Sequence, residues 1–410
     1  MSRIVRLVLA LAFLLALLPT SASAQTTLPA NCQFVPSGSP SLWLFCAPVG
    51  IPWNGDLVVF AHGYVAPNQP LTAGFDQLVL PDGTSIPGLV NSLGYAFAAS
   101  SYPKNGLAVK EGVADTKAMV DVLRTMLQPE HVFLIGASEG GLVTALAMER
   151  YPTVFSGGLS TCGPVGSFRG QVDYLGDFRV AFDYFFPGIL PPSPVSVPQS
   201  LIDGWYSTYA GRVAAAMAAN PGATNQLLRV TRAATNPSDP SSKILTAQQV
   251  LWYNVFSTNE ARIELGGQPF GNQNRVYFGS ANDFRLNQRV QRFVASRVAL
   301  GSIATSYQTS GRLRVPLVTM HTTGDPVVPY WQEPLYTAKT IAAGSARMHV
   351  NIPVARYGHC SFTTAETLGA FALLVSRVTG QPLAGAQTAL QSTASRAEYA
   401  RFADTIGAPR

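Results

Sequence analysis

Charged side chains are scarce in this sequence: Asp, Glu, Lys and Arg make up only 12% of its 410 residues, whereas 47% are hydrophobic. This balance excludes an intrinsically disordered chain and a coiled coil, both of which are rich in charge. The formal net charge is +6, but the basic residues are scattered and form no dense stripe of the kind that binds nucleic acid. The composition therefore predicts a globular protein with a sizeable core and no nucleic-acid partner.

Clustered metal ligands are also lacking. The chain has four cysteines and five histidines, and no two cysteines have the CxxC spacing of a zinc site. We therefore expect neither a metal ion nor another cofactor.

Only one apolar run is long enough to consider as a membrane segment, and it is short. Residues 7–18 follow Arg3 and Arg6 and precede small residues that end at Ala24. A basic start, a short apolar stretch and small residues at its end are typical of a secretory signal peptide. We expect cleavage near Ala24 and export of a chain without a stable membrane span, with an uncleaved anchor as the alternative. The sequence does not distinguish the periplasm from the medium.

Strand and helix patterns alternate in the two outer parts of the chain. The strands are expected at 42–47, 56–61, 95–101, 132–135, 157–161, 316–321 and 348–354, and the helices at 86–93, 109–127, 139–150, 331–343 and 364–378. Asn54-Gly55 predicts a hairpin turn between the first two strands. The alternation predicts an α/β fold with a doubly wound, mostly parallel sheet.

This alternation stops between Cys162 and Arg312. The region is rich in proline and aromatic residues, with helical patterns near 201–218 and 284–299. An insertion of this size is typical of a mainly helical cap over the top edge of the sheet. The predicted organisation is a signal peptide (1–24), a core in two pieces (25–162 and 313–380), a cap (163–312) and a C-terminal tail without a clear core pattern (381–410).

The pentapeptide Gly136-Ala137-Ser138-Glu139-Gly140 matches G-x-S-x-G. The match alone is weak, because glycine and serine are common in this chain. Its context makes it specific: it follows a buried strand and opens a helix, as the tight turn called a nucleophile elbow requires. Ser138 is therefore the predicted nucleophile, and an ordinary glycine-rich loop is the alternative.

A serine hydroxyl needs a base, and the base needs an acid that holds its tautomer. Asp325 lies just beyond an expected strand, and His359 follows after one further helix and strand. This is the chain order that partners of an elbow serine take. His131, His321 and His349 lie at or inside strands and are interpreted as structural, so His359 is the predicted base and Asp325 the acid.

Two backbone N–H groups are expected to bind the oxyanion of the tetrahedral intermediate. One belongs to Glu139, at the start of the helix after Ser138. The other belongs to Tyr64, in the loop after the strand at 56–61, where Gly63 lets the backbone approach and His62 braces the loop.

Together, Leu57–Tyr64, Val132–Gly141, Val315–Pro329 and Tyr357–Phe362 resemble the α/β-hydrolase superfamily, in a secreted bacterial branch with a large cap. The resemblance covers about 60–80, 95–160 and 313–378 and does not extend into the cap. It implies the fold, the triad, the oxyanion hole and hydrolysis without a cofactor.

An exported chain with four cysteines is expected to form disulfides. Cys32 with Cys46 would fix the N-terminal segment. In the implied fold, Cys162 and Cys360 both lie on the top face, so a bridge between them would hold the histidine loop. Two buried free thiols are the alternative for this second pair.

The substrate pocket is expected in the cap. Its aromatic residues could line an acyl site or form the cap's own core. They are Phe168, Tyr174, Phe178, Phe182, Tyr184, Phe185, Phe186, Trp205, Tyr206, Trp252 and Tyr253. The helix expected at 284–299 carries four arginines, which could attract anionic surfaces or simply face solvent.

The favoured function is hydrolysis of a small to medium, apolar or aromatic carboxylic ester through an acyl-enzyme. The alternative is a secreted peptidase or amidase, whose cap would need a carboxylate to bind an amino terminus. The candidates for it are Asp173, Asp177, Asp183 and Glu260. A catalytically inactive binding module is disfavoured by the complete Ser-Asp-His set.

Overall fold

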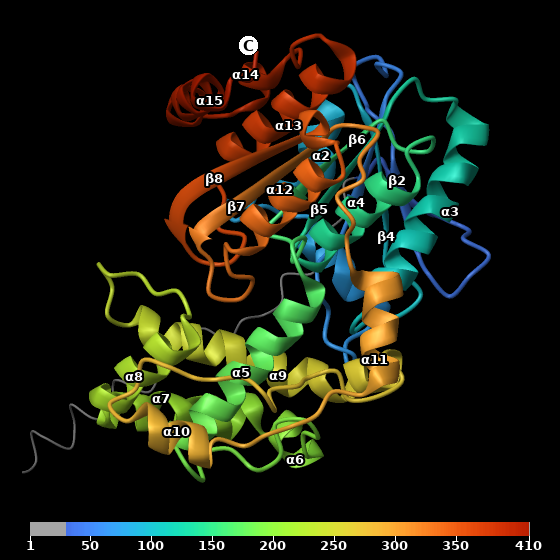
Figure 1. Ribbon diagram of the computed structural model, residues 1–410. Coiled ribbons are helices and arrows are strands. Elements are labelled where there is room, and N and C mark those ends of the chain that lie inside the picture. The colour runs from blue at the N-terminus through green and yellow to red at the C-terminus, as the bar shows by residue number, and fades with distance from the viewer. Residues whose placement is uncertain (1–29, 410) are drawn as a thin grey trace, which may run out of the picture.

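The computed structural model describes residues 30–409, so the predicted signal peptide lies outside the described residues. Its centre is one sheet with the strand order β1-β2-β4-β3-β5-β6-β7-β8 (Figure 1). The strands are β1 (Cys32–Val35), β2 (Trp43–Cys46), β3 (Leu57–Ala61), β4 (Ala96–Ser100), β5 (Val132–Ala137), β6 (Gly157–Thr161), β7 (Leu317–Gly324) and β8 (His349–Tyr357). From β4 to β8 all neighbours are parallel, and β1 and β2 add an antiparallel edge. The predicted fold class is confirmed.

Helices cover both faces of this sheet. The core helices are α2 (Ile86–Ser92), α3 (Val109–Leu127), α4 (Glu139–Arg150), α12 (Gln332–Ala342), α13 (Thr364–Thr379), α14 (Ala386–Ala389) and α15 (Thr393–Ile406), with 3-10 turns η1 (Leu71–Gln77) and η4 (Ala346–Met348). Side chains of β3 alternate between the two faces: Leu57 and Val59 pack with α3, α4 and α12, whereas Val58 and Phe60 pack with α2, α13 and α15. A parallel sheet buried on both faces explains the uninterrupted apolar strands.

The predicted hairpin at Asn54-Gly55 is wrong. The strand that follows it, β3, pairs with β4 and β5, while β2 pairs with β1 and β4. The hairpin instead joins β1 and β2, and the sequence interpretation missed β1, a strand of only four residues. Gly55 does have a positive φ of 93°, so the chain bends there, but the bend does not join two paired strands.

A separate group of helices makes up the region between β6 and β7 (Figure 1). These are α5 (Phe168–Phe185), α6 (Gln199–Asp203), α7 (Ala210–Ala219), α8 (Pro221–Thr231), α9 (Ser242–Glu264), α10 (Asp283–Arg289) and α11 (Arg297–Ser302), with π turns η2 (Trp205–Tyr209) and η3 (Ile303–Tyr307). They bury a cluster of their own that includes Phe178, Phe182 and Trp205. The long helices α5 and α9 were both missed. The helix α9 contacts several neighbours and lacks a single apolar stripe, whereas α5 buries Tyr174, Phe178 and Phe182 at helical spacing, which was a usable signal.

The single helix expected at 284–299 is in fact two helices separated by extended chain. The first, α10, is followed by Val290, whose ψ of 138° is extended. Two polar side chains hold the segment that follows: Asn272 hydrogen-bonds the backbone of Gln291 and Phe293, and Arg292 donates to the carbonyl of Asn272 at 2.9 Å. These contacts replace the helical hydrogen bonds, so the four arginines do not form one helical face.

The segment after Gly380 is not a loose tail. The last helix, α15, packs on α13 and buries Tyr399 and Ala403. A Cβ atom on Gly369 would lie 2.7 Å from the Phe402 ring, so the two helices approach closely there. The signal was present in the sequence, because Tyr399, Phe402, Ala403 and Ile406 have the i, i+3, i+4, i+7 spacing of a helix.

Candidate active site

Ser138 occupies a sharp turn between β5 and α4. Its φ of 56° and ψ of −119° are strained for a residue with a side chain. Small neighbours make the turn feasible: a Cβ atom on Gly136 would lie 2.1 Å from the Gly140 carbonyl, and one on Gly140 would lie 2.0 Å from the carbonyl of Ala61. The strand, turn and helix therefore have the form of a nucleophile elbow.

The three side chains predicted as a triad lie together at the carboxyl edge of the sheet. Asp325 follows β7 and His359 follows β8, and His359 Nδ1 lies 2.7 Å from Asp325 Oδ2. On its other side, His359 Nε2 lies 2.8 Å from Ser138 Oγ. With the Nδ1 proton donated to the carboxylate, Nε2 is the free acceptor that can take the serine proton.

Asp325 is fully buried and held by its own loop. Its Oδ1 accepts the N–H groups of Val327 at 2.8 Å and Val328 at 3.0 Å. Burial alone would raise the pKa of Asp325, but the electrostatic interaction with His359 and the hydrogen bonds from His321 and His359 outweigh it and lower the pKa. The carboxylate is therefore ionised and fixed toward His359.

His321, interpreted from the sequence as a structural histidine of its strand, lies directly behind this carboxylate. Its Nδ1 is 3.0 Å from Glu333 Oε1, and its Nε2 is 2.8 Å from the Val328 carbonyl and 3.4 Å from Asp325 Oδ2. Both ring nitrogens face acceptors, so both must donate and the ring is an imidazolium. Burial opposes this charge, but hydrogen bonds to Asp325 and Glu333 raise the pKa of His321 to about 10.

Further polar groups complete this buried network. The second oxygen of Glu333 accepts from Thr319 Oγ1 at 2.6 Å and from Asn351 Nδ2 at 2.7 Å. The partners come from β7, from the loop after it, from α12 and from β8, which follow one another in the chain and are brought together only by the fold. The network was therefore not visible in the sequence, although a histidine four residues before the predicted acid was a usable signal.

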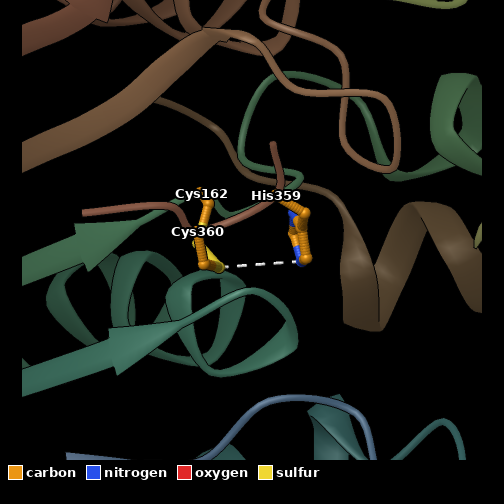
Figure 2. A group of neighbouring side chains, drawn as sticks. All are labelled: Cys162, His359 and Cys360. Atoms are coloured by element: carbon orange, nitrogen blue, oxygen red, sulfur yellow. Dashed lines mark hydrogen bonds between the residues drawn. A yellow bond between two sulfur atoms is a disulfide. The ribbon is translucent and has the colours of Figure 1, made fainter. Parts of the chain in front are cut away.

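The cysteines pair as Cys32–Cys46 and Cys162–Cys360, as expected. Figure 2 shows the second bridge beside the His359 ring, with Cys360 Sγ 3.6 Å from His359 Nε2. Although Cys162, His359 and Cys360 are grouped as metal ligands often are, the two sulfur atoms are bonded to each other and offer no thiolate. The group instead ties the histidine loop to the end of β6.

The loop after β3 approaches the nucleophile from the opposite side. A Cβ atom on Gly63 would lie 3.2 Å from Ser138 Cβ, so glycine permits this approach. Gly63 N–H is used by Gln77 Oε1 at 2.7 Å, whereas no acceptor within residues 30–409 takes the N–H of Tyr64 or Glu139. His62 Nδ1 contacts the Gly63 carbonyl at 2.7 Å, which fits a bracing role.

The main cavity at Ser138 has a volume of about 410 Å³ and is lined mostly by the core, not by the cap. Ser138 and His359 lie in its wall together with apolar side chains from the chain around α2 and from α13. These include Val79, Leu80, Ile86, Leu89, Leu93, Leu368 and Phe371. The sequence interpretation missed this site because residues of α2 and α13 also look like ordinary core residues.

The cap aromatics that were expected to line the pocket do not form one group. Only Tyr253 among them lines the main cavity. With Phe168 it also lines a cavity of about 90 Å³ on the other side of Ser138. Trp205, Tyr206, Trp252 and Tyr253 line an open cleft that reaches His359. Phe178, Phe182 and Phe186 belong to the cap core.

The four candidate carboxylates for binding an amino terminus are all engaged elsewhere. Asp173 and Asp177 pair with Arg275, and Asp183 pairs with Arg179. Glu260 binds Lys104 at 2.6 Å and accepts the Leu107 N–H at 2.7 Å. None of the four lines the cavities beside Ser138 or His359.

One unexpected carboxyl group does border the site. Glu139 is buried and lines the smaller cavity, where its Oε1 accepts the Ala108 N–H at 3.0 Å. Burial raises the pKa of Glu139 to about 8, so near neutral pH this side chain is mostly an uncharged acid.

Comparison with known proteins gives structural likeness only. No protein-family model matches the chain, and no curated protein matches it. Among solved structures, the chain is similar to the rice cell wall degrading esterase LipA from Xanthomonas oryzae, with 12% identity, 77% of this chain and 79% of that chain covered, and a TM-score of 0.40. It is also similar to Candida antarctica lipase A in its closed state, with 14% identity, 89% and 82% covered, and a TM-score of 0.42. For Pyrococcus horikoshii acylaminoacyl peptidase the identity is 11%, the coverage 80% and 37%, and the TM-score 0.37.

The sheet and the elbow themselves identify the fold. A mostly parallel sheet carries a serine on the strand–turn–helix after β5, with an aspartate and then a histidine following later in the chain. This arrangement is the α/β-hydrolase fold.

Proposed function

We propose that this protein is a serine hydrolase that cleaves carboxylic esters through an acyl-enzyme intermediate. The observation that carries the proposal is the continuous hydrogen-bonded chain from Ser138 Oγ through His359 to the buried carboxylate of Asp325. A strained serine, a base with its tautomer fixed and an ionised acid are what nucleophilic catalysis requires.

In the proposed reaction, Ser138 Oγ attacks the ester carbonyl while its proton moves to His359 Nε2. The N–H groups of Tyr64 and Glu139, which have no acceptor within the described chain, bind the oxyanion. His359 then protonates the departing alcohol. Water then attacks the acyl-enzyme while His359 takes its proton. His359 returns a proton to Ser138 Oγ as the carboxylic acid leaves.

The main cavity is the proposed acyl site. Its wall contains both Ser138 and His359 and is otherwise dominated by aliphatic and aromatic side chains. With a volume of about 410 Å³, it has room for a small to medium acyl group. An apolar lining stabilises an apolar acyl chain and provides little for a charged one.

The ester assignment is favoured over peptidase activity by the state of the cap carboxylates. A peptidase that reads an amino terminus needs an available anion, and the four candidates are all paired with cations or with backbone. Glu139, which directly follows the nucleophile in the chain, is mostly neutral near pH 7 and does not supply one.

Export through a cleaved signal peptide is part of the same proposal. Two disulfides in the structure are compatible with an oxidising compartment. No helix within residues 30–409 has the length and apolar character needed to cross a bilayer.

The test compares p-nitrophenyl esters of increasing acyl length with aminoacyl nitroanilides, using the mature protein and Ser138→Ala. We expect rapid turnover of the esters, an optimum at a small to medium acyl chain, and loss of this turnover in the variant. Preference for the anilides would replace the ester assignment by peptidase or amidase activity.

A further inference from the structure

The Cys162–Cys360 bridge lies against the reactive nitrogen of the proposed base. Cys360 Sγ is 3.6 Å from His359 Nε2, and one side-chain ligand atom from each of Cys162, His359 and Cys360 lies within 4.8 Å of the other two (Figure 2). While the disulfide is intact, its two sulfur atoms are bonded to each other and are not thiolates. Reduction turns the same group into two thiols and an imidazole.

The spacing of this group fits a tetrahedral zinc ion. Zinc binds thiolate sulfur at about 2.3 Å and imidazole nitrogen at about 2.0–2.1 Å, so at the tetrahedral angle these two ligand atoms lie about 3.6 Å apart. The distance from Cys360 Sγ to His359 Nε2 already has this value, 3.6 Å. Two thiolates on the same ion lie about 3.8 Å apart. The Cα atoms of Cys162 and Cys360 are 5.3 Å apart, so rotation of the two side chains reaches that separation once the bond is reduced.

The other nitrogen of His359 is arranged as in zinc sites. A zinc-bound histidine almost always donates its second ring N–H to a carboxylate, a carbonyl or water, which fixes the ring and makes the binding nitrogen more basic. His359 Nδ1 lies 2.7 Å from Oδ2 of the buried Asp325. Nε2 therefore keeps the lone pair that a metal ion needs.

The group is open on one side to the main cavity. His359, Cys360 and Ser138 all line this cavity, whereas Cys162 is buried at the end of β6. A zinc ion with three protein ligands keeps a fourth position for water, and the cavity has space for it. A small reductant and a metal ion can reach Cys360 by the same route as the substrate.

We propose that Cys162, Cys360 and His359 Nε2 form a zinc site once the disulfide is reduced, and that zinc bound there inhibits the enzyme. A small dithiol supplies the two electrons and two protons that reduce the disulfide and becomes a disulfide itself. Zinc then displaces the two thiol protons and bonds to both sulfurs and to Nε2. With its lone pair on zinc, Nε2 no longer takes the proton of Ser138. The metal site is independent of the proposed function above, but the inhibition rests on it.

The test of the site uses a Cys32→Ser, Cys46→Ser background, in which Cys162 and Cys360 are the remaining cysteines. This protein is reduced with dithiothreitol, freed of reductant without air and titrated with Co²⁺, a visible substitute for Zn²⁺. We expect about one Co²⁺ per chain, with thiolate absorption and the bands of tetrahedral cobalt, and displacement by Zn²⁺. Before reduction these bands should be absent.

Matched variants in the same background test the ligands. His359→Ala should weaken Zn²⁺ binding at least 10-fold, and Asp325→Asn by roughly 10- to 100-fold, the cost of losing the partner of a zinc-bound histidine. His131→Ala, a change at a histidine away from the cavity, should leave the affinity unchanged. A spectrum without thiolate bands, or an affinity that His359→Ala does not alter, would overturn the proposal.

Stability and activity show whether zinc binds the folded enzyme. Because a ligand of the folded state stabilises it, Zn²⁺ should raise the urea midpoint of the reduced protein and not that of the oxidised protein. One equivalent of Zn²⁺ should lower ester turnover of the reduced protein at least 10-fold, and EDTA should restore it. An unchanged midpoint, or full turnover with zinc bound, would contradict the proposal. If neither redox form hydrolyses esters, the proposed function fails, while the cobalt titration still decides the metal site.

Discussion

The loops at the carboxyl edge of the sheet and the helices of the cap border the same cavities, but they are held by different kinds of contact. The loops that carry Asp325 and His359 are fixed by buried ionic hydrogen bonds and by the Cys162–Cys360 bridge. The cap is held by its own apolar cluster and by a few ion pairs with the core, such as Lys104 with Glu260. Changes at the sheet edge should therefore alter the chemical steps, whereas changes at the cavity walls should alter substrate choice.

The largest effect is expected from Asp325→Asn. An amide at this position no longer favours the Nδ1–H tautomer of His359, so the base is lost although the shape of the site is kept. We expect kcat to fall by roughly 10⁴-fold, the size known for a triad aspartate. Ester hydrolysis at pH 7 measures it, with the exposed Asp121→Asn as the matched control. A loss below about tenfold would mean that Asp325 is not the acid.

The two disulfides offer a direct comparison between the sheet edge and a distant site. Replacing both Cys162 and Cys360 by Ser should lower the free energy of unfolding by about 2–5 kcal/mol and also lower kcat, because the histidine loop loses its tether. Replacing Cys32 and Cys46 by Ser should destabilise the protein but leave kcat nearly unchanged. Urea unfolding and ester kinetics on both double variants test this. Equal kcat in the two would contradict the role assigned to the Cys162–Cys360 bridge.

The His321–Glu333 pair should give the protein a recognisable pH dependence. The folded-state pKa of His321 is raised to about 10, above its unfolded value of about 6.5. Its contribution to stability is therefore complete below about pH 6.5 and is lost as the pH rises through about 10.

Glu333→Gln removes the anionic partner of His321 and should lower the free energy of unfolding by about 2 kcal/mol at pH 6. Urea unfolding of both proteins at pH 6 and pH 9 measures it. The difference in the free energy of unfolding between the variant and the unmodified protein should be larger at pH 6 than at pH 9. An equal difference at both pH values would show that His321 is not held as an imidazolium.

A change in the wall of the main cavity should mainly affect selectivity. Leu89→Trp would fill part of the space assigned to the acyl chain. We expect the optimum to move to shorter esters, with roughly a 10-fold loss for longer chains, because overpacking costs about 1–3 kcal/mol. Acetyl ester turnover should change little. The exposed Leu335→Trp serves as the control, and an unchanged chain-length profile for Leu89→Trp would place the acyl group elsewhere.

The contrast between the sheet edge and the cavity walls also explains which parts of the structure could be predicted from the sequence. The sheet was predictable because buried parallel strands form continuous apolar runs, and the elbow because its tight turn restricts the residues beside Ser138. The chain order of acid and base then pointed to Asp325 and His359. Each of these features depends on local residues or on simple order along the chain.

The parts that were missed depend on contacts between distant segments. The partners of His321 come from α12 and from the loop after its own strand, and the proposed acyl cavity combines residues near α2 with residues of α13. The extended chain after Val290 is held by Asn272, about twenty residues earlier. No local pattern encodes such contacts, so the substrate side of the site was predicted less well than the chemical side.

The central claim is that Ser138 is the nucleophile, and the most direct measurement is to trap it covalently. The protein is treated with a fluorophosphonate, digested and examined by mass spectrometry, while ester hydrolysis is followed in parallel. The account predicts one adduct per chain, located on Ser138, with activity lost in proportion to labelling and no adduct in Ser138→Ala. An adduct on another residue, or full activity after complete labelling of Ser138, would contradict it.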